Sequence, residues 1–357
     1  MINVTKTFLP PFEEYTAILK RAWDKGWITN NGELVQELEA KLKDYLGTEH
    51  LLFCSNGTIV LQMAIKALGL TKEVITTPFS YVATTNAILW EGCRPVFVDI
   101  ETKGFGLDPK AIEAAITPET EAILTTLVYG FPGQIDALED IADRHGIKLI
   151  IDGAHAFGCS WQGRSLLSFG HVATTSFHAT KVFHTVEGGA MVTSDSRLNE
   201  KLRLMRQFGH QGDDYIMSGI NAKNSEFHAA MGIAVLPQID RLIFTRRDAY
   251  ECYLRILGGA VQGSNWVQNP HYTYNYSYCP ILFKSEVQLI ACMDRLAAIN
   301  VFPRRYFWPA LNTLPYLSYQ PCPVAEDIAS RILTLPLYPG IELADVEKIG
   351  STVLEFL

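Results

Sequence analysis

The sequence lacks the long apolar runs and the basic leader that membrane-spanning or exported proteins carry. No run approaches the ~18–20 apolar residues that a bilayer span needs, and Met1–Pro11 has no basic segment followed by an apolar one. Low-complexity stretches are missing too, while 48% of the 357 residues are hydrophobic. These features exclude a disordered chain and predict about two packed domains. We therefore expect a cytoplasmic protein without membrane contact.

Cysteine and histidine spacings typical of disulfide or metal frameworks are also missing. The seven cysteines are an odd number with no C-x-x-C pair, and the nine histidines include no H-E-x-x-H. This indicates reduced thiols and no metal site. The formal charge of −8 at pH 7 disfavours a nucleic-acid binder. It leaves room for an anionic small molecule in a local pocket.

Short apolar runs alternate with amphipathic stretches between residues 50 and 195. Helix-period patterns cover Thr58–Leu68 and Ile135–Arg144, for example. The candidate strands are Leu51–Cys54, Val74–Thr77, Pro95–Val98, Ala122–Val128, Lys148–Ile151, Thr174–Phe177 and Ala190–Thr193. Several are continuously apolar, as strands covered on both faces are. The pattern predicts a mostly parallel α/β sheet flanked by helices, with ligands at the carboxyl ends of its strands.

The pattern changes near residue 240. A long helix is predicted over Ile239–Leu257, followed by an aromatic-rich stretch, a strand at Ile281–Lys284 and a helix at Val287–Ile299. We expect a large α/β domain over residues 1–239 and a smaller C-terminal α+β domain over residues 240–357.

A candidate phosphate seat follows the first strand run. In Ser55-Asn56-Gly57-Thr58, the glycine permits a tight turn, and the free amides of the helix that begins here attract anions. The same residues also fit an ordinary strand-to-helix turn with Thr58 as the cap. The P-loop spacing and the complete dinucleotide fingerprint are absent.

Two titratable residues follow later strands. Asp152 comes directly after an apolar run, where a sheet presents ligand groups, although it could equally cap a helix. Lys181 lies shortly after another strand, and burial would lower its pKa so that the amine attacks a carbonyl; most lysines, however, are solvated. Phosphate seat, acid and lysine are together the parts that hold pyridoxal phosphate. A hydrolase built from Ser176, His178 and Asp152 is a weaker alternative because G-x-S-x-G is missing.

Short segments occur in a characteristic order along nearly the whole chain. They are Trp27-Ile-Thr-Asn30, Ser55-Asn-Gly-Thr58, Tyr81-Val-Ala-Thr84, Asp152-Gly-Ala-His155, Ser176-Phe-His-Ala-Thr-Lys181, Glu187-Gly-Gly189 and Gly219-Ile-Asn221 with Glu226. This order resembles the DegT/DnrJ/EryC1/StrS family of sugar aminotransferases. The resemblance implies pyridoxal-phosphate fold type I with a seven-stranded sheet. It also implies a homodimer with shared active sites, acting on a nucleotide-linked keto-sugar and L-glutamate.

The resemblance implies a role for each matching residue. Lys181 would hold the cofactor as a Schiff base, and Asp152 would pair with its ring nitrogen and keep it protonated. Tyr81 would stack on the ring, and His155 would lie near its phenolic oxygen. The phosphate would be bound by Asn56, Gly57, Thr58 and Ser176, joined by Asn221 of the partner subunit. The implied substrate contacts are Thr29, Asn30, His178, Arg304 and Tyr306.

Without the resemblance, several of these residues have plainer interpretations. Tyr81 would be a core residue, Asn221 a turn residue, and Arg304 with Arg305 a basic pair on the surface. The chain also departs from the family pattern twice. Gly153 follows the acid where Ala or Cys is more frequent, and we expect a looser turn there. Val186 stands before Glu187 in a loop where glycine is frequent, which leaves the geometry of that loop open.

The retained lysine indicates transamination, because relatives with histidine at that position perform dehydration. The segments Thr77–Thr84 and Arg304–Trp308 resemble enzymes that convert dTDP-4-keto-6-deoxyglucose to its 4-amino sugar, for deoxysugar, O-antigen or lipopolysaccharide biosynthesis. The alternatives are a C-3 keto-sugar aminotransferase and a regulator that binds pyridoxal phosphate without turnover. The regulator would need a DNA-binding module, and no basic helix-turn-helix segment is present. These residues do not determine the amino position, the stereochemistry or the nucleotide.

Overall fold

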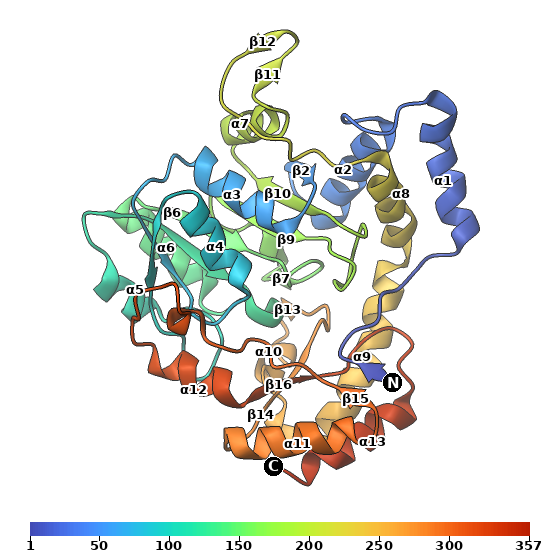
Figure 1. Ribbon diagram of the computed structural model, residues 1–357, viewed down its shortest axis with the longest axis vertical. Coiled ribbons are helices and arrows are strands. Elements are labelled where there is room, and N and C mark those ends of the chain that lie inside the picture. The colour runs from blue at the N-terminus through green and yellow to red at the C-terminus, as the bar shows by residue number, and fades with distance from the viewer.

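The protein is described from a computed structural model of residues 1–357, built around a seven-stranded sheet (Figure 1). Its strands are β2 (His50–Cys54), β3 (Glu73–Thr76), β4 (Arg94–Phe97), β5 (Thr120–Thr126), β6 (Lys148–Asp152), β9 (Val172–Ser176) and β10 (Gly189–Thr193). The strand order is β2-β10-β9-β6-β5-β3-β4. Only β10 runs antiparallel to its neighbours β2 and β9. The predicted mostly parallel, seven-stranded sheet is confirmed.

One predicted strand is too long at its end. The run Ala122–Val128 was expected to be strand throughout, but β5 ends at Thr126 and a 3₁₀ turn, η1, follows at Val128–Gly130. Tyr129 has a φ of 57°, which a strand cannot accommodate, and its amide donates to His155 Nδ1 at 3.1 Å. The chain therefore leaves the sheet to reach a histidine, which an apolar run does not reveal.

Helices cover both faces of the sheet. One face carries α3 (Gly57–Ala67), α4 (Val82–Trp90) and α7 (Ser196–Arg206); the other carries α2 (Glu33–Leu46), α5 (Pro109–Ala115), α6 (Ile135–His145) and α8 (Glu226–Val235). Successive strand residues enter different cores: Leu52 packs on the first face and Phe53 on the second. Both faces are buried, which explains why the strand runs show no polar alternation.

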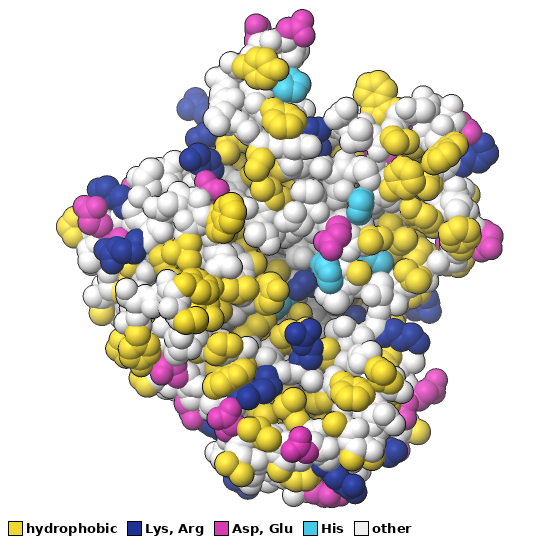
Figure 2. Space-filling view, viewed as in Figure 1, with side chains coloured by type: hydrophobic (Ala, Val, Ile, Leu, Met, Phe, Trp, Pro, Cys, Tyr) yellow, Lys and Arg dark blue, Asp and Glu magenta, His cyan; other side chains and the backbone are white.

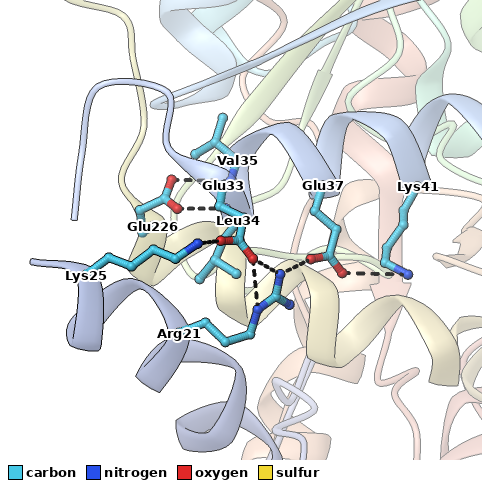
Figure 3. Close-up of polar contacts among 8 residues, drawn as sticks. All are labelled: Arg21, Lys25, Glu33, Leu34, Val35, Glu37, Lys41 and Glu226. Carbon is cyan, nitrogen blue, oxygen red and sulfur yellow. Dashed lines mark hydrogen bonds and ion pairs between the residues drawn. The ribbon is translucent and has the colours of Figure 1, made fainter. Parts of the chain in front are cut away.

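The connection into α2 is held by a carboxylate from a distant helix (Figure 3). Glu226 of α8 accepts hydrogen bonds from the amides of Leu34 at 2.7 Å and Val35 at 3.2 Å, so it satisfies the N-terminus of α2. Ion pairs join α1 (Phe12–Lys25) to α2 beside it: Arg21–Glu33, Lys25–Glu33, Arg21–Glu37 and Lys41–Glu37 within α2. Exposed pairs contribute little individually. The buried Glu226 is therefore the stronger restraint on this connection.

The C-terminal part packs below the large sheet in Figure 1. It contains α9 (Ile239–Leu257), which has the predicted bounds, together with β14 (Cys279–Leu282), β16 (Ile332–Leu335), α11 (Glu286–Ala297), α12 (Pro323–Arg331) and α13 (Leu343–Leu354). Strands β14 and β16 pair antiparallel, and β1 (Ile2–Asn3) pairs with β15 (Val301–Phe302). The N-terminus thus joins the C-terminal part; the domain boundary at residue 240 stays a prediction.

Shorter elements complete the chain. They are η2 (Leu166–Ser168), η3 (Leu236–Gln238), η4 (Gly258–Ala260), η5 (Leu311–Thr313), α10 (Ser264–Val267), the small sheet of β7 (Ser160–Trp161), β8 (Arg164–Ser165) and β13 (Tyr272–Thr273), and the hairpin of β11 (His210–Gln211) and β12 (Asp214–Tyr215). The hairpin projects from the body of the molecule (Figure 1). The hairpin exposes Tyr215, and its flanks expose Phe208, Ile216 and Ile220. None of the helices combines the length and hydropathy needed to cross a membrane.

Candidate active site

A cavity of about 330 Å³ opens at the carboxyl ends of the central strands. It is visible as a hollow in the face shown in Figure 2, with basic, acidic and histidine side chains at its edge. The predicted site residues that line it are Asn56, Gly57, Thr58, Tyr81, Asp152, His155, Ser176, His178, Lys181, Arg304 and Tyr306. Three further predicted residues, Thr29, Asn30 and Asn221, are not part of its lining.

Asp152 is the last residue of β6 and is only 5% exposed. Its Oδ2 accepts from Thr84 Oγ1 at 2.7 Å and Thr126 Oγ1 at 3.5 Å, and its Oδ1 accepts from the Ala154 amide at 3.2 Å. Burial raises the pKa of this carboxyl, and the hydrogen bonds from Thr84 and Ala154 oppose the rise. No helix follows that Asp152 could cap. A cation in the cavity is the partner that would stabilise its ionised form.

A hydroxyl network behind Asp152 was missed in the sequence. Ser80 Oγ lies 2.9 Å from both Thr84 Oγ1 and Thr126 Oγ1, and all three residues are buried. Ser80 and Thr126 follow or end strands β3 and β5, at the same edge of the sheet as Asp152. Hydroxyl residues at strand ends were the available signal, but strand order was needed to bring them together.

Lys181 lies in the loop that connects β9 to β10. The loop is closed by hydrogen bonds from the Ala179 amide to Val186 O at 2.8 Å and from the Lys181 amide to His178 O at 2.9 Å. Burial lowers the pKa of the Lys181 amine, and the negative charge of Asp152 opposes that effect. The neutral, nucleophilic amine is therefore more available than in a solvated lysine.

His155 is held as a neutral ring with a defined tautomer. Its Nδ1 accepts from the Tyr129 amide, which places the ring proton on Nε2. Burial, and to a smaller extent the charge of Lys181, lower its pKa well below the usual value. Phe307 stacks on the ring at 5.6 Å and Tyr278 meets it edge-on at 4.8 Å. His155 is thus a fixed hydrogen-bond donor in the cavity wall.

The turn into α3 uses its side chains differently from the predicted cap. Asn56 Oδ1 accepts from the amides of Thr58 at 3.0 Å and Ile59 at 2.8 Å, so Asn56 and not Thr58 caps the helix. The Gly57 amide has no partner inside the helix. A Cβ at Gly57 would lie 2.9 Å from Cβ of Ser176, so glycine lets this amide approach the serine hydroxyl. The available donors at the seat are the Gly57 amide and the Ser176 and Thr58 hydroxyls.

The turn after Asp152 is tighter than the sequence suggested. A Cβ at Gly153 would lie 2.3 Å from Leu167 Cδ2, and the Gly153 amide donates to Thr174 O at 2.8 Å. The expectation of a looser turn was therefore wrong. Glycine at this position allows the end of β6 to pack directly against β9 and η2.

The adjacent arginines have separate roles. Arg304 lines the cavity, with its guanidinium 5.0 Å from the ring centre of Tyr306. Arg305 points elsewhere, donating to Glu286 Oε1 at 2.6 Å and Ser330 O at 2.7 Å. The two residues do not form a surface basic pair, because the exposed Arg304 lines the cavity whereas Arg305 is tied into the C-terminal part.

The three predicted residues outside the cavity are all exposed. Thr29 and Asn30 lie in the connection between α1 and α2. Asn221 accepts from Lys223 Nζ at 2.8 Å and follows the projecting hairpin. None of the three lines the cavity of its own subunit.

The sequence pattern of the DegT/DnrJ/EryC1/StrS aminotransferase family matches residues 12–354. The chain belongs to this family. A dTDP-4-amino-4,6-dideoxy-D-glucose transaminase of Shigella dysenteriae is 40% identical over 99% of this chain and 98% of its own length. A transaminase of the same name from Escherichia coli is 36% identical over 99% of this chain and 98% of its own length. The protein is thus a pyridoxal-phosphate-dependent aminotransferase, and these two relatives are named for a nucleotide-linked amino sugar.

The fold of this aminotransferase agrees with a solved relative. The structure of DesI in the presence of its TDP-sugar product superimposes with a TM-score of 0.93 at 33% identity, covering 99% of this chain and 93% of that one. The cavity also fits the cofactor chemically. Its hydrogen-bond donors converge beside Gly57, its buried carboxylate needs a cation, and Tyr81, a residue that is 61% exposed, lines it with an aromatic side chain. These features suit a phosphate, a protonated ring nitrogen and a flat heteroaromatic ring respectively.

Proposed function

We propose that this aminotransferase converts dTDP-4-keto-6-deoxyglucose to the corresponding 4-amino sugar, with L-glutamate as the amino donor. The observation that carries the proposal is the full-length similarity to transaminases named for that amino sugar. The resemblance to the DesI structure, solved with a TDP-sugar product, supports the same substrate class. A C-3 amino sugar is the alternative product, and the experiment below distinguishes the two.

In the proposed reaction, Lys181 would hold the cofactor as a Schiff base until the amino group of L-glutamate displaces it, and the freed amine would then carry a proton. Pyridoxal phosphate, when bound, supplies an electron sink for negative charge at the donor's α-carbon. The amine of Lys181, whose pKa is lowered by burial, takes the proton from that carbon and delivers it to the cofactor side. Asp152 holds a negative charge for the ring nitrogen, and His155 offers its Nε2 proton to a ring oxygen.

Neutral donors bind the cofactor phosphate in this proposal. The Gly57 amide and the hydroxyls of Ser176 and Thr58 lie at the N-terminus of α3, where the helix dipole favours an anion. Asn56 contributes by capping the helix and shaping the turn. A net charge of −8 is therefore compatible with a phosphorylated cofactor and a diphosphate substrate.

We also propose a homodimer in which Asn221 of the partner subunit completes each phosphate site. Two features support it: Asn221 lies exposed outside its own cavity, and the neighbouring hairpin exposes apolar side chains that a second copy would cover. Mixed dimers that carry Asn221→Ala in one subunit and Lys181→Ala in the other test this, because each keeps a single Lys181. If sites are shared, that site receives Asn221 from the Lys181→Ala subunit and should bind cofactor with wild-type affinity; a weakened site would show that Asn221 acts within its own subunit and would argue against sharing.

Substrate contacts are proposed for residues at the cavity mouth. The guanidinium of Arg304 is exposed and suits a diphosphate or a donor carboxylate, with Tyr306 beside it. His178 lines the same mouth. Thr29 and Asn30 do not line the cavity of their own chain. Their role as substrate contacts therefore stays a prediction.

We propose a cytoplasmic location and a role in supplying an amino sugar for O-antigen or lipopolysaccharide. All seven cysteines are buried and unpaired, which is compatible with a reducing compartment. The nucleotide-sugar relatives support the biosynthetic role.

The deciding experiment is incubation of the holoenzyme with L-glutamate and a panel of dTDP-linked 4-keto and 3-keto sugars. Nuclear magnetic resonance of the product locates the new amino group, which we expect at C-4. Borohydride should fix the cofactor onto Lys181, and Lys181→Ala should abolish turnover while retaining the fold. Amination at C-3 would support the alternative, and no amination of any sugar would refute the proposal.

A further inference from the structure

Glu187 lines the same cavity as Lys181, and its carboxylate is not among the groups proposed to bind the cofactor. Its side chain is 55% exposed, and its Oε1 lies 3.7 Å from His178 Nε2. No arginine or lysine forms an ion pair with it. The carboxylate is therefore available to accept hydrogen bonds from a ligand in the cavity, in keeping with the acidic and histidine side chains at one edge of the hollow in Figure 2.

The backbone that positions Glu187 includes a strained residue. Val186, the preceding residue, has a φ of 69°, a conformation that is unfavourable for a β-branched side chain. Its amide donates to His184 Nδ1 at 3.2 Å, and its carbonyl accepts from Ala179. Strain of this kind persists only where the surroundings enforce it, and such positions concentrate at functional sites.

Two more hydrogen bonds fix the peptide of Glu187 itself. Its carbonyl accepts from Thr185 Oγ1 at 2.8 Å and from Asn224 Nδ2 at 3.1 Å. Asn224 is buried and also donates to Cys54 O at 3.1 Å, so it ties this loop to β2 next to the phosphate seat. The carboxylate is thus presented from a rigid base at a defined distance from the cofactor site.

His178 complements the carboxylate. Its Nδ1 accepts from the Thr180 amide at 3.3 Å and lies 2.9 Å from Thr180 Oγ1, so Nε2, the atom nearest Glu187, is the ring nitrogen left to face the cavity. The 3.7 Å gap is too long for a hydrogen bond between them. A hydroxyl group both donates and accepts, so it can bond to both side chains at once. A carboxylate of the amino donor would instead be repelled by Glu187.

We propose that Glu187 is a specificity-determining residue for the keto-sugar, whose hydroxyl next to the carbonyl donates to the Glu187 carboxylate and accepts from His178. This inference rests on the proposed function. It assigns Glu187 to the sugar half of the reaction and not to the glutamate half.

The two half-reactions can be followed separately in the holoenzyme by cofactor absorbance. Glu187→Ala should leave the rate with L-glutamate within about twofold of wild type, while kcat/KM for dTDP-4-keto-6-deoxyglucose falls about 10- to 150-fold, the equivalent of one charged hydrogen bond. Glu187→Gln keeps one acceptor oxygen, so its kcat/KM for the sugar should lie between those of wild type and Glu187→Ala. Glu347→Gln, an exposed residue of α13, is the matched control and should match wild type.

A substrate lacking the hydroxyl, dTDP-4-keto-3,6-dideoxyglucose, completes the test. With this sugar, kcat/KM of the wild type should fall well below its value for dTDP-4-keto-6-deoxyglucose. For Glu187→Ala, kcat/KM should be nearly the same with the two sugars. Equal losses in both half-reactions, or none in either, would overturn the assignment. If wild type reacts with glutamate but aminates no sugar, the proposed function itself fails, and the inference fails with it.

Discussion

The buried ion pair of Arg206 and Glu39 supports the strand that leads to the phosphate seat. Arg206, 3% exposed at the end of α7, donates through Nη1 to Glu39 Oε1 at 2.5 Å and to Phe53 O at 2.8 Å, and through Nη2 to Asn31 Oδ1 at 3.2 Å. Glu39 Oε1 also accepts from the Phe53 amide at 2.8 Å. The pair therefore joins α7, α2 and β2 just before the turn into α3.

Removing one partner leaves the other charge without its counter-ion in a largely buried place, because the side chain of Arg206 is 4% exposed and that of Glu39 15%. We expect Arg206→Met and Glu39→Met each to lower the free energy of unfolding by about 3–5 kcal/mol. The double variant removes both charges and leaves only the Phe53 amide and carbonyl without these partners, at about 1–3 kcal/mol each. It should cost about as much as one single variant, so the coupling energy should be about 3 kcal/mol or more.

Urea unfolding of all four proteins, at one protein concentration and saturating cofactor, measures this cycle. The control is the exposed pair Arg203–Glu200 on the same helix, at 2.6 Å, whose single variants should change stability by about 0–1 kcal/mol. Single variants of the buried pair that cost under about 1 kcal/mol, or a double variant equal to the sum of the singles, would refute the reasoning.

Three further predictions concern the cofactor loop and seat. Val186→Gly relieves a positive φ and should raise the free energy of unfolding in urea by about 0.5–2 kcal/mol, after the extra chain entropy of glycine is subtracted. A lower free energy of unfolding would show that Val186 is not strained. Asp152→Asn removes the charge that raises the pKa of Lys181, so the neutral amine should be available at lower pH. Absorbance measures covalent attachment of pyridoxal phosphate to the apoprotein, and the pH midpoint of attachment should move down. An upward shift would exclude this coupling. Gly57→Ala places a Cβ 2.9 Å from Cβ of Ser176 and should weaken cofactor binding by about tenfold or more in a fluorescence titration, with unfolding midpoints little changed; unaltered affinity would contradict the seat.

Much of the fold and of the cavity could be read from local sequence patterns. Continuous apolar runs predicted the sheet because strands covered on both faces need no polar alternation, and α9 has the bounds that its periodicity indicated. Asp152 and Lys181 were singled out because one stands at the end of a strand and the other shortly after one, and the family resemblance then assigned their roles. These signals lie within a few consecutive residues, so they survive without any knowledge of strand order.

Those local patterns did not predict the contacts between segments that are distant in the sequence. The capping of α3 by Asn56, the close packing at Gly153 and the separation of Arg304 from Arg305 each depend on which side chain or backbone group lies opposite. The order β2-β10-β9-β6-β5-β3-β4 places strands from distant parts of the chain side by side, and it brings Ser80 and Thr126 to Asp152. Local propensity specifies the elements, whereas the positions of hydroxyls, carboxylates and close-packed glycines around the cavity follow from long-range packing, which consecutive residues do not encode.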